Sequence, residues 1–311
     1  MSGEVNAAAA VVQNDVCANC GIAQVDEIKL DDCGGCDLVK YCGDKCRGEH
    51  RGQHEEECKK RAKKLHDDDL FTQPDGTHLG ECPICFLPLP LEHEKSMYRS
   101  CCSNLICVGC IVAQTKSNIH DEVKAGRCPF CREPVAENEE ESSRLMDRVN
   151  AKDPAALSYM GGECYAEGDY DSAFDYCTKA AELGDVDGHY KLACLYDEGK
   201  GVEKDEEKGA YHFEKAAIGG HPGARMILGY SERMDGRTER AVKHFIIAAN
   251  LGYKDAMKQL WDEFKVGNIT KEDLDTTLRT HQAAIDATKS SERDFAEKFL
   301  RNVNFLEELN R

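Results

Sequence analysis

The position of its cysteines constrains this chain more than any other feature. Fifteen of its 18 cysteines precede residue 132, and most of them stand in Cys-x2-Cys pairs. Such a pair places two sulfurs on one side of a metal ion without strain. Disulfide bonds are the other common use of many cysteines, but they are typical of small secreted proteins. Redox-active dithiols are the alternative use of such pairs. Because so many spaced pairs occur together, the sequence predicts zinc-binding modules in the N-terminal half.

The charge and the hydropathy of the chain narrow the classes of partner. With 40 basic and 58 acidic side chains, the formal net charge is −18, which repels phosphate and argues against a nucleic-acid surface. The sequence has no run of about 20 apolar residues to cross a bilayer. It also begins without the basic region of a secretory signal. We therefore expect a cytoplasmic or nuclear protein whose partners are proteins rather than membranes or nucleic acids.

Eight candidate ligands lie between residues 17 and 58, in the pairs Cys17-x2-Cys20, Cys33-x2-Cys36, Cys42-x3-Cys46 and His54-x3-Cys58. Thiolate and imidazole are the usual zinc donors, and four donors per ion make two sites. The spacing resembles that of the MYND-type zinc finger over residues 15–60, here called the first finger. The resemblance implies two interleaved ligand sets. The first is Cys17, Cys20, Cys42 and Cys46; the second is Cys33, Cys36, His54 and Cys58.

Two positions of the first finger depart from the MYND pattern. Arg47 stands where the family usually has Gln, and Arg51 stands where it has Trp. MYND modules bind proteins, several of them proline-containing peptides, and the lost aromatic side chain removes a surface on which proline would stack. We therefore predict the zinc-binding fold of this finger more firmly than its binding of peptides. His50 is a competing imidazole, but His54 has the family spacing, so His50 is expected to be exposed.

A second group of cysteines occupies residues 80–134, here called the second finger. It reads Cys82-Pro-Ile-Cys85, Cys101-Cys102, Cys107-x2-Cys110 and Cys128-Pro-Phe-Cys131. This order resembles a RING finger, which also binds two zinc ions in a cross-brace. The resemblance implies a third zinc site, made by Cys82, Cys85, Cys107 and Cys110. It also implies a fourth site that includes Cys128 and Cys131.

The sequence leaves two assignments possible for the other two ligands of the fourth site. Asn104 stands where the RING pattern has a histidine, and an amide is a poor zinc ligand. We predict that the adjacent Cys101 and Cys102 both coordinate the ion. The alternative is a three-thiolate site completed by a distant histidine, either His93 or His120. The predicted set is Cys101, Cys102, Cys128 and Cys131.

The four predicted zinc ions are structural rather than catalytic. Each site has four protein ligands, which leaves no position for an activated water, and metal binding stabilises segments too small to build a core. RING fingers that act in ubiquitin transfer dock a conjugating enzyme. The resemblance gives Ile84, Pro129 and Arg132 as candidate contacts, and a guanidinium suits this role because its fork bonds several carbonyls. Alternatively, Ile84 and Pro129 only shape the zinc loops and Arg132 is solvated.

From about residue 150, helical periodicity replaces the cysteine pairs. A Lys-Ala-Ala-x-x-Gly pattern ends two successive units at Gly184 and Gly220, and Ala248-Ala249-x-x-Gly252 ends the next one. The three glycines are spaced 36 and 32 residues apart. Periods in this range indicate stacked helix pairs, and glycine just after a helix suits a positive φ. The pattern resembles Sel1-like repeats, an α-solenoid class related to tetratricopeptide repeats. Core positions are expected for Cys164, Cys177 and Cys194.

The expected fold is two small zinc-stabilised cross-brace modules followed by an α-solenoid of helix-turn-helix repeats, mainly α overall. The expected segments are a disordered N-terminus (1–14), the first finger (15–60), a linker (61–79), the second finger (80–134), a flexible acidic linker (135–150), and repeats with a C-terminal capping helix (151–311). The expected function is a zinc-binding protein-interaction adaptor. Its second finger is either a RING-type ubiquitin ligase, which needs no covalent active-site residue, or part of a non-catalytic scaffold.

Overall fold

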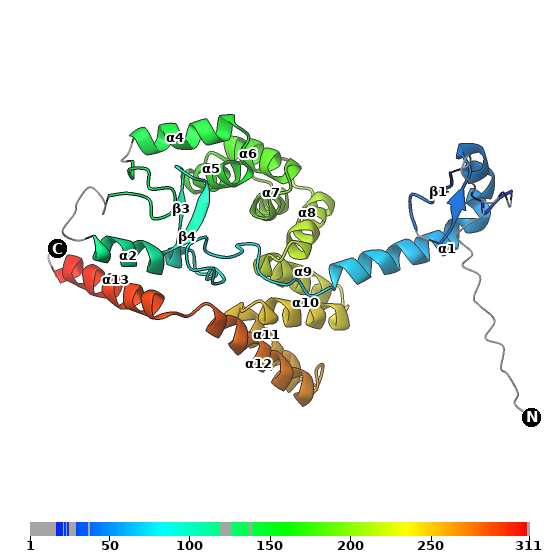
Figure 1. Cartoon of the computed structure of the whole chain (residues 1–311). Helices are drawn as coiled ribbons and strands as arrows, with labels where there is room; N and C mark the ends of the chain where they lie inside the picture. The colour runs from blue at the N-terminus through cyan, green and yellow to red at the C-terminus, as the bar shows by residue number, and fades with distance from the viewer. Residues whose placement is uncertain are drawn as a thin grey trace, which may run out of the picture. The chain divides into compact units, whose positions relative to one another are not determined.

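The computed structural model describes residues 17–309 apart from 21, 23, 25–28, 37, 119–125 and 137–138, without the side chains of 302–309. The expected disordered segment 1–14 lies outside these residues. The chain divides into two compact units, Met1–Thr72 and Gln73–Arg311, and Figure 1 labels their helices and strands. The first unit holds the first finger. The second unit holds the second finger together with the repeats.

The first unit is a short hairpin followed by a long helix. Strand β1 (Asp31–Asp32) pairs antiparallel with β2 (Lys40–Tyr41), with Asp31 opposite Tyr41. Helix α1 (Asp44–Leu70) follows directly and includes the first ten residues of the expected linker 61–79. Ion pairs one turn apart, such as Lys59 with Glu55 at 2.7 Å, support this polar helix.

The second finger contains a second small hairpin. Strands β3 (Ser96–Arg99) and β4 (Asn104–Cys107) pair antiparallel, and the 3-10 turn η2 (His93–Lys95) and helix α2 (Val108–Ser117) flank them. Ser96 lies opposite Cys107 and Arg99 opposite Asn104. The small core of this finger combines Leu89 and Ile106 with ligand cysteines, as expected where metal replaces apolar bulk.

Helices α5 to α12 pack side by side and form the solenoid of the second unit (Figure 1). Their bounds are α5 Pro154–Glu167, α6 Tyr170–Glu182, α7 Val186–Glu198, α8 Glu206–Ile218, α9 Pro222–Met234, α10 Thr238–Asn250, α11 Lys254–Lys265 and α12 Lys271–Ala287. Side chains such as Asp153 and Asp185 cap the helix starts by accepting backbone N–H bonds. The predicted solenoid is confirmed, and among the described residues no helix has the length and apolarity to span a bilayer.

Small residues set the distance between the solenoid helices. A Cβ added to Gly188 would lie 2.7 Å from the Cβ of Ala180, and one added to Gly161 would lie 2.5 Å from the Cys177 sulfur. Cys164 and Cys177 are buried in the apolar core, as expected, whereas Cys194 is only partly buried. The three repeat-ending glycines adopt φ values of 82°, 86° and 86°, as the sequence predicts.

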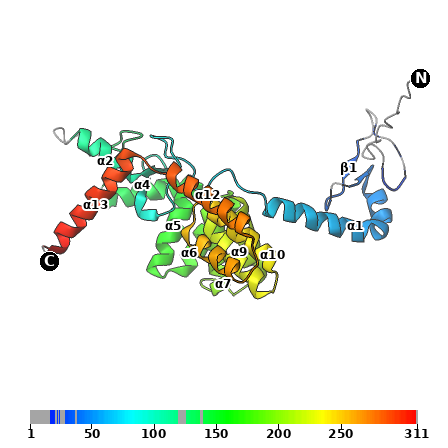
Figure 2. The ribbon, with the colours of Figure 1, turned by 90° about the horizontal axis from the view of Figure 1, so that it is seen from below.

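Two helices outside the solenoid differ from expectation. Residues 139–150 of the expected flexible linker form helix α4 (Glu139–Asn150), in which Arg144 pairs with Glu140 at 2.6 Å and also donates to the carbonyl of Pro134. Helix α13 (Ser291–Leu309) was expected to cap the repeats. It packs instead along α2 of the second finger, as Figures 1 and 2 both show, because Arg293 finds its hydrogen-bond acceptors there.

Candidate metal centres

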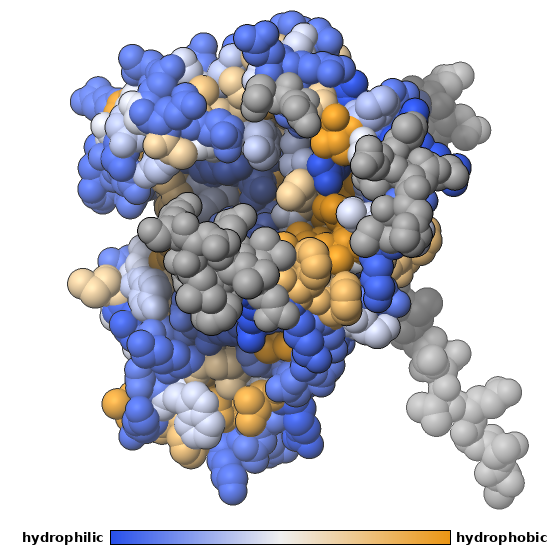
Figure 3. Space-filling view, turned by 90° about the vertical axis from the view of Figure 1, so that its left-hand side faces the viewer, coloured by the Kyte–Doolittle hydropathy of each residue, from blue (hydrophilic) through white to orange (hydrophobic). Residues whose placement is uncertain are grey.

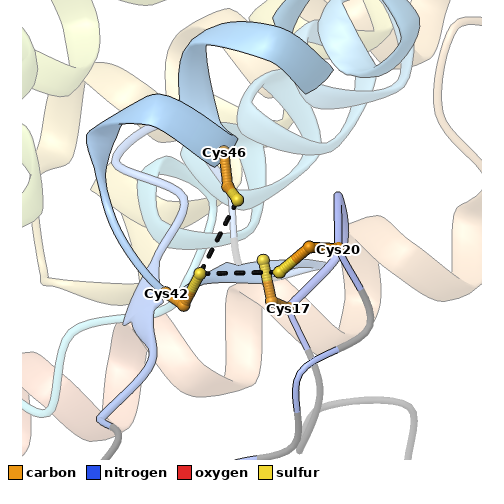
Figure 4. A group of neighbouring side chains, drawn as sticks. All are labelled: Cys17, Cys20, Cys42 and Cys46. Carbon is orange, nitrogen blue, oxygen red and sulfur yellow. Dashed lines mark hydrogen bonds between the residues drawn. The ribbon is translucent and has the colours of Figure 1, made fainter.

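The first predicted ligand set comes together around the hairpin of the first finger (Figure 4). Cys17 and Cys20 lie on a loop that bonds to β2 through Ala18, Cys42 follows β2, and Cys46 lies in the first turn of α1. All four sulfurs lie within 4.8 Å of one another. Cys42 is 3.6 Å from both Cys20 and Cys46.

The second set is formed by the loop of the same hairpin and by helix α1. Cys33 and Cys36 form a tight turn before β2, while His54 and Cys58 stand one turn apart on α1. The Cys36 sulfur is 3.2 Å from His54 Nε2, and the Cys33 and Cys58 sulfurs are 3.6 Å apart. The structure thus brings together the four side chains of each predicted set. His50 is partly buried rather than exposed, because its Nδ1 bonds the Tyr41 hydroxyl at 3.0 Å.

Two loops of the second finger repeat one backbone geometry. The N–H of Phe86 bonds the Cys82 carbonyl at 2.8 Å, and the N–H of Arg132 bonds the Cys128 carbonyl at 2.9 Å. In both loops the residue after the second cysteine has a positive φ, 55° at Phe86 and 64° at Arg132. We call these two loops the zinc knuckles. Each turns its two sulfurs toward one point.

The third set combines the first knuckle with the end of β4 and the start of α2. Its sulfurs, from Cys82, Cys85, Cys107 and Cys110, lie within 4.8 Å of one another. Cys82 is 3.9 Å from Cys110, and Cys85 is 3.8 Å from Cys107.

In the fourth set, both adjacent cysteines face the second knuckle. Cys101 is 3.4 Å from Cys131, and Cys102 is 3.9 Å from Cys128. Asn104 turns its amide to the Cys102 carbonyl at 2.8 Å instead of joining the sulfurs. Of the alternative histidines, His93 has a fully exposed side chain (100%) beside Glu94. His120 lies outside the described residues.

The donor sets fit zinc. A tetrahedral ion with Zn–S bonds of 2.3 Å holds its sulfurs about 3.8 Å apart. Seven close sulfur–sulfur pairs in these sets lie 3.4 Å to 3.9 Å apart, and all ligand atoms of a set lie within 4.8 Å of one another. In the first set, burial raises the pKa of Cys17, but backbone N–H donors outweigh it and lower that pKa to about 6. The neighbouring thiols raise the pKa of Cys42 to about 12. Since four thiolates repel one another, a cation is needed to hold them together.

The candidate enzyme contacts lie in the two knuckles. Ile84 is partly buried against the core of the second finger, and Pro129 is partly buried in the second knuckle. Arg132 is exposed, and its carbonyl accepts from Arg127 at 2.9 Å. Near them Phe86 and Phe130 are 71% and 46% exposed, so each knuckle presents an apolar side chain to solvent.

One polar cluster was missed by the sequence reasoning. His78, just before the second finger, places Nε2 at 3.1 Å from Asp187 Oδ1, and His221 Nε2 lies 3.5 Å from the same oxygen. His221 Nδ1 accepts the Ala224 N–H at 3.1 Å, so a neutral His221 carries its proton on Nε2, toward Asp187. The His78 bond helps to lower the pKa of Asp187 despite its burial. The cluster fastens residues 73–80 to the solenoid, where His78 N–H also bonds the Gly220 carbonyl.

A groove of about 1240 Å³ separates the second finger from the last helices. Its apolar wall, which defines the groove here, is formed by Leu89, Leu91, Leu251, Tyr253, Ala296 and Leu300. Glu92 of the finger accepts from Lys254 of α11 at 3.0 Å across it. Figure 3 shows the side on which α2 and the end of α13 lie, where hydrophobic residues gather near the middle and hydrophilic ones surround them.

Comparison with known proteins identifies two kinds of module. A model of the MYND finger matches residues 17–58, and a model of the Sel1 repeat matches residues 154–185, 186–221 and 232–253. The chain carries a MYND finger and Sel1 repeats. Neither of these two models extends over residues 80–134. The MYND finger and the further cysteine groups together indicate a zinc-binding protein.

Individual relatives resemble parts of the chain. Chitin synthase regulatory factor 4 of Schizosaccharomyces pombe (strain 972 / ATCC 24843) is 30% identical over 86 residues, which are 27% of this chain and 14% of that protein. A Sel1 repeat protein from Oxalobacter formigenes aligns over 51% of this chain and 69% of its own, with 25% identity and a TM-score of 0.41. A protective antigen of uropathogenic Escherichia coli strains, displaying an SLR fold, aligns over 53% and 37%, with 22% identity and a TM-score of 0.38.

Proposed function

We propose that this protein is an intracellular adaptor that assembles other proteins through its MYND finger and its Sel1 solenoid. The observation that carries the proposal is the presence of both modules in one chain. Stacked repeats present extended binding surfaces, and exposed aromatic residues on this solenoid include Tyr211 and Trp261. A cytoplasmic or nuclear location belongs to the proposal, because thiolate zinc sites persist where cysteines stay reduced.

Affinity purification of the full tagged chain from its own cells tests the adaptor proposal. We expect a reproducible set of partners, part of which is lost when Cys33→Ser removes a ligand of the MYND finger. Another part should be lost when Tyr211 and Trp261 are replaced by Ser on the folded solenoid. Partners that stay equally abundant with all variants, or no partner above background, contradict the adaptor function.

The cofactor part of the proposal is four structural zinc ions per chain. Four sets of four ligand atoms converge within 4.8 Å, and four protein ligands fill a tetrahedral site without an open position for chemistry. Zinc supplies only cross-links between loops here. The protein itself positions the ligand sulfurs, because backbone hydrogen bonds fix the turn of each knuckle.

A finer proposal concerns the second finger, which we infer to be a RING-type module that recruits a ubiquitin-conjugating enzyme. Its support is the pair of knuckles with an exposed Arg132, and with Ile84 and Pro129 at the family's contact positions. Purified protein should form ubiquitin chains with a panel of conjugating enzymes, and Ile84→Ala or Arg132→Ala should reduce the yield. Arg279→Ala, at an exposed position of α12, is the matched control. Folded, zinc-loaded protein that is inactive with the whole panel leaves the non-catalytic scaffold.

A further inference from the structure

Arg293, in the first turn of α13, reaches into the third zinc site. Its Nη1 donates to the Pro88 carbonyl at 2.7 Å, and its Nη2 donates to the Leu87 carbonyl at 3.2 Å and to the Cys85 sulfur at 3.3 Å. These three acceptors lie in or just after the first knuckle, and Nη1 also donates to the Thr288 carbonyl just before α13 at 2.7 Å. A side chain 208 residues away in sequence therefore bonds a predicted zinc ligand directly.

Helix α2 has a glycine, Gly109, at the point where Arg293 packs against it. A Cβ added to Gly109 would lie 2.7 Å from Arg293 Cγ and 2.9 Å from its Cα, so any larger residue would push α13 away. Farther along the contact, the Lys116 ammonium lies 4.2 Å from the centre of the Phe295 ring, a favourable cation–π distance. The docking of α13 on α2 is thus anchored at two points, and only the first of them touches the metal site.

The fourth site is also contacted by an arginine, from helix α4, which precedes the solenoid in the sequence. Arg148 of α4 donates to the carbonyls of Ser100 and Cys101 at 3.1 Å and 2.8 Å. Its bonds to the second finger go to carbonyl oxygens, and it also pairs with Asp153 at 3.7 Å, whereas Arg293 bonds a sulfur. The two helices that flank the solenoid in sequence therefore both hold the second finger, but α13 alone bonds a ligand sulfur in the contacts described.

The chemistry of the third site makes this contact matter for the metal. Four thiolates around a divalent ion leave a net charge of about −2, and a guanidinium beside Cys85 offsets part of it. Hydrogen bonds to a ligand atom orient it, and their loss typically costs 10- to 100-fold in metal affinity. Conversely, a bound ion fixes the first knuckle, and with it three of the four acceptors that Arg293 bonds.

We propose that Arg293 is a positioning residue of the third zinc site, and that it couples zinc occupancy there to the docking of helix α13. Coupling between two sites is reciprocal, so zinc tightens the docking and docking tightens zinc. Ala296 and Leu300 of α13 form part of the groove wall. Loss of the third ion therefore removes these two residues from the groove wall.

The test compares Arg293→Met with Arg301→Met in the full chain. Arg301 is on the same helix, but its side chain is 76% exposed and, among the described residues, pairs with Glu297. Zinc release to a chromogenic chelator should become at least 10-fold faster for one of the zinc equivalents in Arg293→Met and should be unchanged in Arg301→Met. Hydrogen exchange should show lost protection in α13 for Arg293→Met, with α12 and the MYND finger unaffected.

Two further variants keep the proposal falsifiable if Arg293→Met disturbs folding. Gly109→Ala displaces the arginine without changing any charge and should also speed the release of one equivalent. Cys110→Ser removes a third-site ligand that Arg293 does not contact in the bonds described, and it should release α13 to exchange. Wild-type zinc release in Gly109→Ala and Arg293→Met, or an α13 that stays protected in Cys110→Ser, would overturn the coupling.

Discussion

The buried His221 should make the stability of the solenoid depend on pH. Its side chain begins α9, is 12% exposed, and stacks on Tyr190 with ring centres 3.9 Å apart. Burial, with smaller contributions from the charges of His78 and Lys191, lowers the pKa of His221 from 6.5 to about 3, although Asp187 acts in the opposite direction. At pH 5 it is therefore neutral in the folded protein and protonated in the unfolded chain.

The sign and the size of the effect follow from this difference in pKa. Because the folded pKa lies below the unfolded one, the stability contributed by neutral His221 is complete above pH 6.5 and is lost as the pH falls from there toward 3. Between about pH 7.5 and pH 5.0 the unfolded chain takes up nearly one proton at this residue, and the folded protein takes up almost none. Linkage then gives a loss of about 2 kcal/mol from this single residue.

The assay is urea unfolding in excess zinc at both pH values, followed by the fluorescence of Trp261, the only tryptophan. His221→Asn retains an acceptor for the helix cap and removes the titrating ring, so it should lose about 2 kcal/mol less than the wild type over this pH interval. Comparing the two differences cancels the effect of acid on the zinc sites. His93→Asn, at a fully exposed histidine, should behave as the wild type. Equal losses in His221→Asn and the wild type would refute the reasoning.

Two other predictions address the fourth zinc site and the solenoid core. Cys101→Ser and Cys102→Ser should each remove one zinc equivalent in metal analysis, and His93→Ala should remove none, because the two cysteines face the second knuckle and the histidine faces solvent. A loss with only one of the cysteine variants contradicts the double-cysteine site. Gly229→Ala would place a Cβ 2.5 Å from the fully buried ring of Phe245. This should cost about 1–3 kcal/mol of stability in urea unfolding, and an unchanged midpoint would show that the contact relaxes freely.

What the sequence predicted well is local. The spacing of Cys82 and Cys85 determines a knuckle, because a two-residue gap in a tight turn aims both sulfurs at one point. Likewise, Gly184 marks the end of a helix because its φ of 82° suits glycine above other residues. The solenoid followed from the repeat period, since each helix pair buries its small residues against the next.

What the sequence could not predict is the set of contacts between distant segments. From the sequence, Arg293 is expected to be an ordinary charged residue at the start of an amphipathic helix. No neighbouring residue indicates that its side chain bonds Cys85. His78 and Asp187 carry no shared pattern either, although they lie 3.1 Å apart. The run of glutamates before Arg144 suggested a flexible linker from composition. The structure holds this helix by bonds from Arg144 to the Pro134 carbonyl and from Arg148 to carbonyls of the second finger.

The central claim is that the cysteine thiolates coordinate zinc rather than form disulfides with one another. Native mass spectrometry of the freshly purified full chain tests this claim most directly. None of the 18 cysteines forms a disulfide in this structure, and sixteen ligand atoms converge in four sets. We predict a dominant species with four zinc ions per chain and the mass of a fully reduced polypeptide. Fewer than four ions in the native species, or a mass deficit from sulfur–sulfur bonds, would contradict the account.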